Sequence, residues 1–588
     1  MIRKITSLVF AAFAMAATAF ADGYLTFNWA HSVDGQTTSG DNVIAMDKAL
    51  DGNYLICTQF STTDKTLNVK FDGEILTDAS GTPIEGSTYD TSAGASQNRN
   101  MLLQKVNAQT GAVEWFAYTK KGDVEQTSTA VKATADGGVV MTVKTRAWQP
   151  NAGLDNLLEF VDATGATTTV KDMWTKKGEY RFLLLKLDKS GKLEWTRLIC
   201  GQAYDAGEAG YKYATKENAY TYGLDSDADG NIYICGNFRT KLFLRNAEGA
   251  VDTLFAKSNV NWTGDSQLSV GDMFIAKFDK NGYVTGTLTT EGVADCAFFD
   301  NLIVSDGKIY LNGRVKGNGL TLGGKAIAAS ADRQTMIFAS VNASDLSVNY
   351  VKAITSAPDT RNRFALQNNN MQLVDGSLYS TGLITGGFSD GDKVFLDNTQ
   401  SKMYKAYVLK VDPATGDVQN SLVRLDGGIG GNFGVYVGKN NTYTFGYDMA
   451  KGALLTKYDN QKYEKVDEVQ ICDYGIIALC AAPIIDGDNF VMMNRGGVAN
   501  NFTNEASFYG TDTKFTNLAC FGSVYYSYKI DDTVTTAVTG VSAEGKASNY
   551  DVYTVGGVLL KQASSYDEAV KGLSAGVYVI GDQKVTLK

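Results

Sequence analysis

The stretch FLLLKLDKSGKLEW, Phe182–Trp195, decides the fold, because it reads as two short strands joined by a tight turn. An apolar run ends in Lys-Leu-Asp, the chain turns at Gly191, and a second strand carries Trp195. Asp, Ser and Gly in such a turn favour a hairpin connection. We therefore predict a β-hairpin here. Five further copies of this pattern occur along the chain, and its first strand alone occurs once more, at Ser523–Asp531; the five copies are Leu102–Trp115, Phe274–Gly286, Met336–Tyr350, Tyr407–Gln419 and Leu454–Val466.

A second pattern lies between consecutive hairpins and consists of a Gly or Asn turn followed by an alternating strand. Its clearest copy is DGNIYICGNF, Asp229–Phe238. Alternation with a period of two indicates a β-strand. A further strand pair occurs in most repeats, as in Lys241–Phe255. The second pattern occurs seven times, at Asp51–Phe60, Asp136–Lys144, Asp229–Phe238, Asp306–Arg314, Asp375–Gly382, Asn440–Gly446 and Gly487–Asn494.

One strand set repeated in a fixed order indicates a single repeat architecture, in which each set is too small to stand alone. About four strands per repeat make each set one blade of a β-propeller, and the short sixth repeat predicts only about three. The last hairpin copy, Ser523–Asp531, lacks the strand that should follow it. Tyr24–Val33 supplies that strand, with Trp29 at the place of Trp195. We therefore predict an all-β, seven-bladed β-propeller over residues 22–532, closed by the N-terminal strand, because closure removes two exposed sheet edges.

The repeats resemble a known family. One blade fits the pattern D-x-x-G-N-x-Y-x-x-G…F-x-x-K-x-D-x-x-G best, and its matching residues are Asp229, Gly230, Asn231, Tyr233, Gly236, Phe274, Lys277, Asp279 and Gly282. The chain from Asp22 to Asp532 thus resembles the seven-bladed propeller repeat proteins that bacteria secrete. Because these motifs shape turns and strands, the resemblance implies a fold and not an activity.

Residues 1–21 read as a secretory signal. Arg3 and Lys4 give a basic start, an apolar, alanine-rich run ends at Phe20, and Ala19-Phe20-Ala21 fits a small-residue cleavage site. The apolar run is too short to span a bilayer, and no other run in the sequence is long enough. We therefore expect cleavage before Asp22, no transmembrane segment, and a mature protein that is secreted or held at the outer-membrane surface.

The C-terminal part begins with a linker rich in Thr, Ala, Gly and Ser, residues 533–549. Residues 550–588 predict a small β-sandwich-like domain, with strands around Asp551–Thr554, Gly557–Lys561, Gly576–Ile580 and Lys584–Leu587. This end resembles the C-terminal sorting domain of the type IX secretion system of Bacteroidota. That resemblance implies release outside the cell or attachment to its surface, and a purely structural β-domain is the alternative. The matching residues are Val552, Tyr553, Gly557, Leu573, Gly576, Val577, Tyr578, Val579, Lys584 and Lys588.

Composition excludes some classes of partner. The net charge is -10, and it becomes -12 when Arg3 and Lys4 leave with the signal. An acidic surface argues against nucleic acid and anionic membranes as partners. With 44% hydrophobic and 20% charged residues, the chain has the balance of a globular protein and not of a disordered one. The seven cysteines lack any CxxC spacing, so we expect small buried strand residues, whose disulfide status stays open.

The sequence carries no recognisable catalytic motif. Its single histidine, His31, excludes histidine-based triads and multi-histidine metal sites, and we expect it to be a strand residue of the propeller. The glycine run Gly427–Gly434 lacks the Lys-Ser/Thr of a phosphate loop, and we expect a turn there. Catalysis by carboxylates remains open, because a propeller assembles its sites from different blades and the chain has 64 Asp and Glu.

One motif resembles a metal site, DSDADGNIY, which starts at Asp225. Asp225, Asp227 and Asp229 fall at the first, third and fifth positions of a calcium loop. Gly230 falls at the sixth position, but Gly236 stands at the twelfth, where a bidentate Glu should lie. Other repeats carry the same turn, so a structural turn is the first interpretation. Calcium held by these three carboxylates is the alternative, and we expect no other cofactor.

These observations favour a secreted or cell-surface propeller that acts as a binding or adhesion module for a protein or glycan. Long loops, export signals and the missing catalytic motif support it, and Tyr211–Gly223 offers four tyrosines that could stack on sugars. A carboxylate-based extracellular enzyme, a glycoside hydrolase or lyase, is the first alternative. It requires Asp or Glu side chains that converge at the mouth of the central channel. A structural surface component without a soluble ligand is the second, and the oligomeric state stays open.

Overall fold

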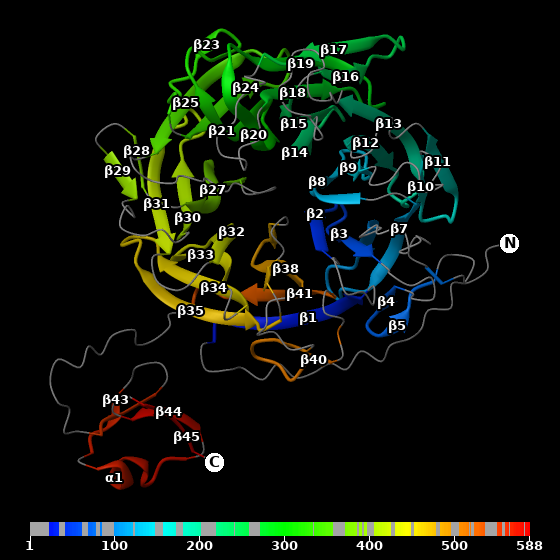
Figure 1. The fold of residues 1–588 in the computed structure, drawn as a ribbon. Coiled ribbons are helices and arrows are strands. Elements are labelled where there is room, and N and C mark those ends of the chain that lie inside the picture. The colour runs from blue at the N-terminus through cyan, green and yellow to red at the C-terminus, as the bar shows by residue number, and fades with distance from the viewer. Residues whose placement is uncertain are drawn as a thin grey trace, which may run out of the picture.

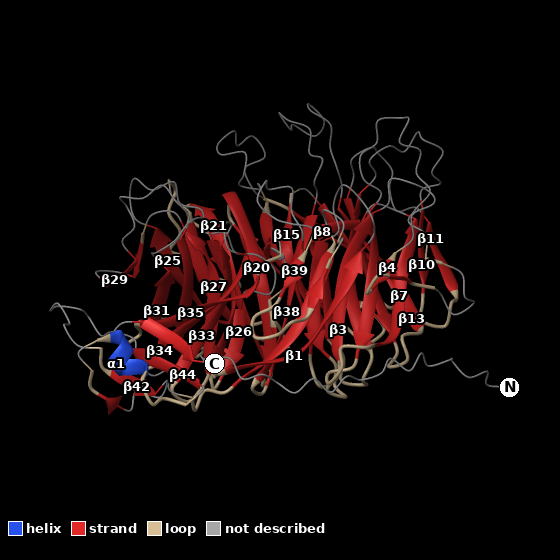
Figure 2. Ribbon diagram, turned by 90° about the horizontal axis from the view of Figure 1, so that it is seen from below, coloured by secondary structure: helices blue, strands red, loops and turns tan. Residues whose placement is uncertain are grey.

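The structure is a computed structural model. The expected signal, residues 1–21, and residues 535–549 of the expected linker lie outside the described residues. The described part forms 45 strands and one short helix, so the predicted all-β class is confirmed (Figure 2). It covers residues 23–34, 42–61, 69–77, 83–84, 99–121, 124–146, 157–171, 180–201, 219–239, 241–257, 271–332, 334–356, 371–384, 387–390, 393–396, 405–424, 430–448, 452–474, 476–477, 482–495, 505–516, 518, 522–534, 550–554, 559–563, 565–574, 576–580 and 583–587.

Antiparallel sheets follow one another around a central axis (Figure 1). We number them in chain order and give their strands from the axis outward. Sheet 1 contains β2 (Asn42–Lys48), β3 (Tyr54–Ser61), β6 (Arg99–Val106), β7 (Val113–Lys121), β10 (Leu157–Val161) and β11 (Thr167–Lys171). Sheet 2 contains β8 (Val124–Ala133), β9 (Val139–Arg146), β12 (Tyr180–Leu187), β13 (Leu193–Gly201), β16 (Lys241–Arg245) and β17 (Val251–Phe255).

The next four sheets repeat this order. Sheet 3 contains β14 (Ala219–Ser226), β15 (Ile232–Phe238), β18 (Asp272–Phe278), β19 (Val284–Glu291), β22 (Thr321–Leu322) and β23 (Lys325–Ala326). Sheet 4 contains β20 (Ala294–Ser305), β21 (Lys308–Gly317), β24 (Thr335–Asn342), β25 (Val348–Ser356), β28 (Phe388–Asp390) and β29 (Lys393–Leu396). Sheet 5 contains β26 (Met371–Val374), β27 (Ser377–Ile384), β30 (Lys405–Val411) and β31 (Val418–Arg424), and sheet 6 contains β32 (Gly430–Val437), β33 (Asn441–Asp448), β34 (Gly452–Asp459) and β35 (Lys465–Cys472).

Sheet 7 joins the two ends of this part of the chain. The predicted partnership is present, because β1 and β41 pair antiparallel from Leu25 opposite Ile530 to Val33 opposite Ser523. A small separate pair, β39 (Ala506–Ser507) and β40 (Lys514–Phe515), lies outside the sheet. Sheet 7 contains β36 (Ile476–Ile477), β37 (Ile484–Asp486), β38 (Asn489–Arg495), β41 (Ser523–Ile530), β1 (Leu25–Asp34), β4 (Lys70–Phe71) and β5 (Glu74–Ile75).

Each sheet buries both of its faces against its neighbours. Strand β15 shows this most clearly, since all seven of its residues are buried. Tyr233 and Cys235 pack into the cluster shared with sheet 4, while Ile232 and Ile234 pack into the cluster shared with sheet 2. This strand is therefore buried along its whole length, and not on one face only as its predicted alternation indicated. Three predicted buried cysteines are confirmed, because the thiols of Cys57, Cys235 and Cys472 are free and buried.

An aromatic residue on the fourth strand of a sheet packs onto the hairpin turn of the next sheet. In sheet 2, the indole Nε1 of Trp195 donates to the carbonyl of Lys280 in the turn between β18 and β19, at 3.1 Å. A Cβ atom at Gly282 of that turn would lie 2.6 Å from the Trp195 ring, and Gly282 has a φ of +76°. The turn therefore requires glycine for its conformation and for the close approach of the ring.

The same contact joins sheet 7 to sheet 1. The Nε1 of Trp29 in β1 donates to the carbonyl of Ala108 at 3.0 Å, and the Trp29 ring lies over Gly111. The first and last segments of this part of the chain are thus held both by a strand ladder, between β1 and β41, and by a side-chain contact with the next sheet.

Two interfaces exchange large and small residues. In sheet 3, Gly286 occupies the position that Trp195 has in sheet 2. In the facing turn of sheet 4, Leu346 occupies the position that Gly282 has in sheet 3. In sheet 5 the position is Asn420, and both it and Tyr463 in the turn of sheet 6 line the same small cavity. Leu346 and Tyr463 both have positive φ, at 60° and 56°, so the turn keeps its shape without glycine. Between sheets 3 and 4 the space is filled, because Leu346 lies 3.2 Å from a Cβ atom placed at Gly286, whereas the cavity remains between sheets 5 and 6.

Two expectations about strand number were wrong. Sheets 1 to 4 have six strands each and not four, because hairpins such as β10–β11 and β16–β17 extend the outer edge beyond the fourth strand. The short sixth repeat supplies four strands and not three, since its strands β32 to β35 are joined by turns of only a few residues.

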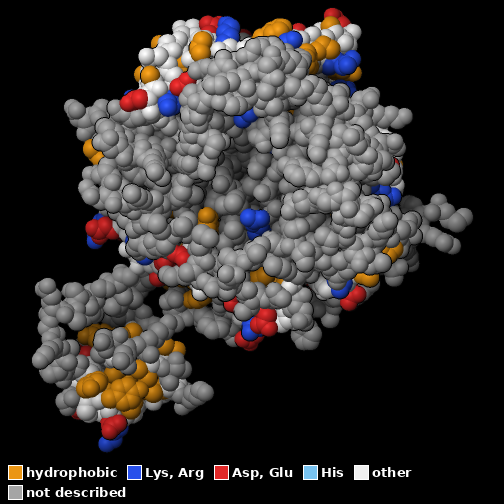
Figure 3. Space-filling model, viewed as in Figure 1, with side chains coloured by type: hydrophobic (Ala, Val, Ile, Leu, Met, Phe, Trp, Pro, Cys, Tyr) orange, Lys and Arg blue, Asp and Glu red, His pale blue; other side chains and the backbone are white. Residues whose placement is uncertain are grey.

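The C-terminal residues form one sheet and not a sandwich. Its order is β43 (Leu559–Lys561), β42 (Val552–Thr554), β44 (Gly576–Ile580) and β45 (Gln583–Leu587). Helix α1 (Tyr566–Val570), which the sequence did not predict, packs Ala569 against Val552 and Ile580 and so takes the place of a second sheet. Figure 3 shows hydrophobic side chains gathered on this part of the surface, where Tyr550, Leu560 and Tyr566 are exposed.

Replacing Gly282 by Ala tests the contact between sheets. Gly249 is a matched control, because it also has a positive φ, of +82°, but nothing lies within 4 Å of its added Cβ. We expect Gly249→Ala to cost about 1 kcal/mol in left-handed backbone strain. Gly282→Ala should cost about 1–3 kcal/mol more, because the Trp195 ring must move. Equal shifts of the urea midpoints of the two variants would contradict the contact.

Candidate functional site

An open pocket of about 360 Å³ lies at the axis among the innermost strands β2, β8, β20, β26 and β37. We call it the axial pocket. Ten of its fifteen lining residues are apolar, among them Met46, Ile303, Leu373 and Ile485 on different strands, but polar atoms supply about half of the exposed pocket surface. Charged residues among its described lining are limited to Asp47, Lys48 and Lys132. Ligand pockets commonly combine apolar side chains with a few polar and charged groups.

The carboxylate of Asp47 is already committed to its neighbours. Its Oδ2 accepts the backbone N–H of Ala133 in β8 at 2.8 Å, and its Oδ1 lies 3.4 Å from the Nζ of Lys132. This hydrogen bond links the innermost strand of sheet 1 to that of sheet 2. The charge of Asp47 raises the pKa of Lys132, so the ammonium stays charged.

Two further pairs of innermost strands are linked in the same way, by a side chain that accepts a backbone N–H. The Oδ2 of Asp225 in β14 accepts the N–H of Val304 in β20 at 2.8 Å, and the Oε1 of Gln372 in β26 accepts the N–H of Val435 in β32 at 2.7 Å. Each side chain thus satisfies a backbone donor of the next sheet. Burial raises the pKa of Asp225, against the opposing charge of Lys132 at 3.9 Å. The carboxylates of Asp47 and Asp225 thus link neighbouring innermost strands, and carboxylate catalysis gains no support from the described axial residues.

The calcium-like turn places its three carboxylates in different roles. Asp225 accepts the N–H of Val304 in the next sheet, whereas Asp227 closes the turn by accepting the N–H groups of Asp229 and Asn231 with Oδ1 and the hydroxyl of Tyr233 with Oδ2. Asp229 is exposed on the turn. Within the described ranges, no group of three or more His, Cys, Asp or Glu side chains could hold a metal ion. Calcium binding by these residues stays a prediction.

His31 lies at the junction of three segments. Its Nδ1 is 2.6 Å from Asp72 Oδ2 in the β4–β5 turn, and its Nε2 is 2.8 Å from the carbonyl of Thr110 in the turn between β6 and β7. The ring stacks on Phe71 at 5.2 Å. Burial alone would lower the pKa of His31, but the hydrogen bond and charge of Asp72 and the bond to Thr110 raise it above 6.5. His31 therefore connects sheet 7 to sheet 1, as a structural residue.

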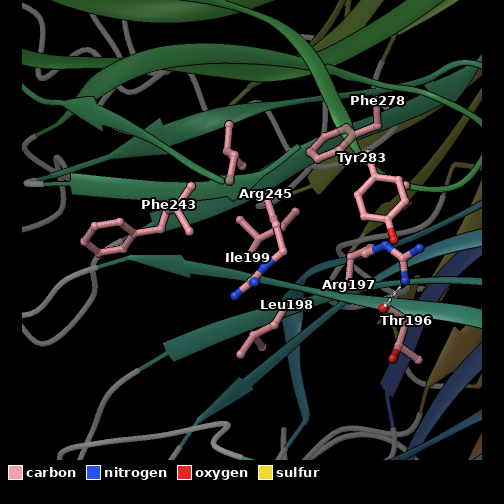
Figure 4. A pocket seen from close by; sticks show the side chains of 11 residues that line it. Thr196, Arg197, Leu198, Ile199, Phe243, Arg245, Phe278 and Tyr283 are labelled. Carbon is pink, nitrogen blue, oxygen red and sulfur yellow. Dashed lines mark hydrogen bonds between the residues drawn. The ribbon is translucent and has the colours of Figure 1, made fainter. Parts of the chain in front are cut away.

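A second cavity, of about 310 Å³, opens at the outer part of sheet 2 and faces sheet 3 (Figure 4). We call it the rim groove. Strand β16 pairs with β13 only at Cys200 and Gly201, so the two strands separate beyond these residues. Ile199, Leu244 and Phe278 give the groove its apolar walls.

Two arginines line the rim groove. The guanidinium of Arg197 lies 4.2 Å from the ring centre of Tyr283 and 5.2 Å from that of Trp195, and its Nη1 donates to the carbonyl of Thr196 at 2.8 Å. Arg245 comes from β16, and its hydrogen bond to the carbonyl of Gly249 is long, at 3.5 Å. In the part of the chain that the structure describes, neither guanidinium has a carboxylate partner.

The sequence could identify few of these residues. Asp47, Lys132 and Arg197 stand in strands whose repeat pattern explains them without any special role, and their partners lie on other sheets. A signal existed for Arg197, since it follows Trp195 by two residues and so shares its face of the strand. The tyrosine-rich stretch Tyr211–Gly223 falls mainly outside the described residues, which resume at Ala219.

Comparisons with known proteins give distant structural likenesses only. No protein-family model and no curated protein matches the chain. The quinohemoprotein alcohol dehydrogenase of Comamonas testosteroni is 13% identical with a TM-score of 0.35, over 92% of this chain and 80% of that one. A protein of unknown function from Dyadobacter fermentans is 10% identical with a TM-score of 0.36, over 69% and 95%. The apocarotenoid oxygenase of Synechocystis is 10% identical with a TM-score of 0.31, over 76% and 90%.

At these TM-scores the likenesses carry no argument about activity, and we draw none. In the described part of the chain, no helix has the length and apolar character needed to cross a membrane.

Replacing His31 by Phe tests the junction of sheets 7 and 1. The pKa of His31 is raised on folding, so its stabilising contribution is complete below about pH 6.5 and disappears as the pH rises through the folded-state pKa. We expect His31→Phe to lower the melting temperature most at about pH 5.5 and least at about pH 9.

Asp72→Asn should remove the same pH dependence, because it deletes the partner that raises the pKa of His31. Thermal unfolding of both variants and the unaltered protein across this range checks the assignment. A melting temperature of His31→Phe that differs from that of the unaltered protein by the same amount at every pH would contradict it.

Proposed function

We propose that the protein is a seven-bladed β-propeller, closed by β1, that is exported and acts outside the cell as a binding module for a protein ligand. The axial pocket is its binding site. Residues 22–532 form the propeller, residues 533–549 the linker, and residues 550–588 a domain that directs export.

Ring closure is supported by contacts at both sides of β1. Its ladder with β41 completes sheet 7, and Trp29 and His31 bond to the turn that follows β6 in sheet 1. On the other side, Tyr24 is fully buried and its hydroxyl donates to Asp467 of sheet 6 at 3.0 Å. A ring leaves no terminal sheet face in water, which favours this arrangement for sheets that are apolar on both faces.

Export is supported by features at both ends of the sequence. Residues 1–21 have the basic start, apolar run and small-residue site of a secretory signal. Residues 550–588 resemble the type IX sorting domain, and the exposed side chains of Tyr550, Leu560 and Tyr566 offer this domain an apolar contact surface. We therefore place the mature protein in the medium or on the outer-membrane surface.

The composition of the axial pocket carries the binding role. Its apolar side chains come from separate innermost strands, and Asp47, the one carboxylate among its described lining residues, is held by Ala133 and Lys132. We take the apolar side chains of this mixed lining to favour a protein partner, whose apolar side chains they can contact, over the hydroxyl-rich surface of a glycan. A binding module therefore fits this pocket better than a glycoside hydrolase or lyase.

A peptide library displayed on phage, and a glycan array in parallel, test the proposal. We expect peptide binders rich in apolar residues. Leu373 and Ile485 are half-buried in the pocket, so a Leu373→Asp/Ile485→Asp variant should weaken those binders by about tenfold to hundredfold, through the lost burial of apolar surface.

Val394→Asp is the matched control, because Val394 is an exposed apolar residue on the outer strand β29, and it should leave binding unchanged. Affinities measured by interferometry check both variants, and circular dichroism checks their folding. Binders that tolerate the double variant, or screens that return nothing, would contradict a binding role for the axial pocket.

A further inference from the structure

The rim groove has features of a second binding site, distinct from the axial pocket. It lies among the outer strands of sheet 2, whereas the axial pocket is lined by innermost strands. Its walls combine apolar side chains with the guanidinium groups of Arg197 and Arg245, which come from the separate strands β13 and β16 (Figure 4).

The charge of the groove is unusual for this protein. The chain carries 64 acidic residues against 54 basic ones, yet neither arginine pairs with a carboxylate in the described ranges. By contrast, Lys186 of the same sheet does pair with carboxylates, since it lies 2.6 Å from Glu194 and also contacts Asp136. Two unpaired cations in an acidic protein favour an anion supplied from outside.

Arg197 is held ready for such an anion. The rings of Tyr283 and Trp195 hold its guanidinium by cation–π contacts, at 4.2 Å and 5.2 Å. Its Nε is buried and has no hydrogen-bond partner, and of its terminal groups Nη1 bonds to Thr196. A guanidinium held through its face keeps N–H groups at its edge for a carboxylate, which matches their spacing.

The rest of the groove suits an extended, apolar chain. Ile199, Leu244 and Phe278 supply an apolar wall. Because β16 leaves β13 after Cys200 and Gly201, the outer edge of β13 from Leu193 to Ile199 has no paired strand within the described residues. An open strand edge offers backbone donors and acceptors to an added peptide.

We infer that the rim groove binds the carboxylate of an extended peptide whose neighbouring side chain is apolar. The carboxylate lies against Arg197 and is attracted by the charge of Arg245, whose guanidinium points away from Arg197 in Figure 4. The apolar side chain packs against Ile199 and Phe278, and the peptide backbone runs along the open edge of β13. The volume of about 310 Å³ limits the part that is enclosed to the end of such a peptide.

Calorimetric titration of the full mature chain with acetyl-Ala-Leu-Leu tests this site. The same peptide as its C-terminal amide has an identical body without the charge, and octanoate has a carboxylate and an apolar body without a peptide backbone. We expect the free acid to bind at least about tenfold more tightly than the amide and than octanoate, from the lost charge-assisted hydrogen bonds and backbone contacts.

Three variants complete the test. Arg245→Gln removes an exposed side chain and leaves folding intact, and Arg197→Gln removes the guanidinium between the two rings; each should weaken the free acid by at least about tenfold. Lys325→Gln, which removes an exposed charge on β23, is the matched control and should have no effect.

Each outcome of these titrations supports or contradicts the peptide site in the rim groove. Equal binding of acid and amide, unchanged affinity in Arg245→Gln, or no binding of any probe would overturn the proposal. If octanoate binds as tightly as the peptide, the proposal of a peptide ligand is overturned, and the ligand is an aliphatic acid. The axial double variant Leu373→Asp/Ile485→Asp should bind the free acid normally, so failure at one site is distinguished from failure at the other.

Discussion

Each sheet of this protein is stable only when both of its faces are covered, and the aromatic–glycine contact between neighbouring sheets sets how that covering occurs. Trp195 over Gly282 and Trp29 over Gly111 bring the fourth strand of one sheet against the hairpin turn of the next. The contact fixes how far one sheet can slide past the other, since the indole also bonds to a turn carbonyl. The apolar clusters between sheets, the hydrogen bonds between innermost strands and the rim groove all depend on that placement.

Much of the fold could be predicted from the sequence, because the hairpin pattern is local. The Lys-x-Asp turn and the tryptophan that follows lie within one short stretch, so the pattern predicts strands wherever it recurs. The pairing of β1 with β41 was also predictable, since Trp29 stands where Trp195 stands in its repeat. The outer hairpin β10–β11 was missed, because Leu157–Val161 and Thr167–Lys171 are short and half of the second strand is exposed. Helix α1 was missed because it is only five residues long.

The candidate sites depend on neighbours in space, and the sequence predicts those poorly. Asp225 stands in a segment that resembles a calcium loop, yet its carboxylate accepts a backbone N–H of Val304, 79 residues away. Asp47 and Gln372 also accept a backbone N–H of a neighbouring sheet, although nothing in their own segments indicates it. The arginines of the rim groove become notable only when the structure brings β13 and β16 together, with no carboxylate partner for either arginine among the residues that it describes. Local motifs therefore located turns, whereas the sites required the arrangement of sheets.

The exchange of bulky and small residues between sheets makes the order of the repeats part of the fold. A sheet that presents Trp195 needs a follower with Gly282, whereas one that presents Gly286 accepts a follower with Leu346. Two repeats transposed along the gene would place an indole against a leucine at one junction and leave an empty space at another. Each junction thus fits its own pair of sheets, and the sheets can follow one another in one order only. Such a protein can diversify its loops freely, but it cannot shuffle its repeats.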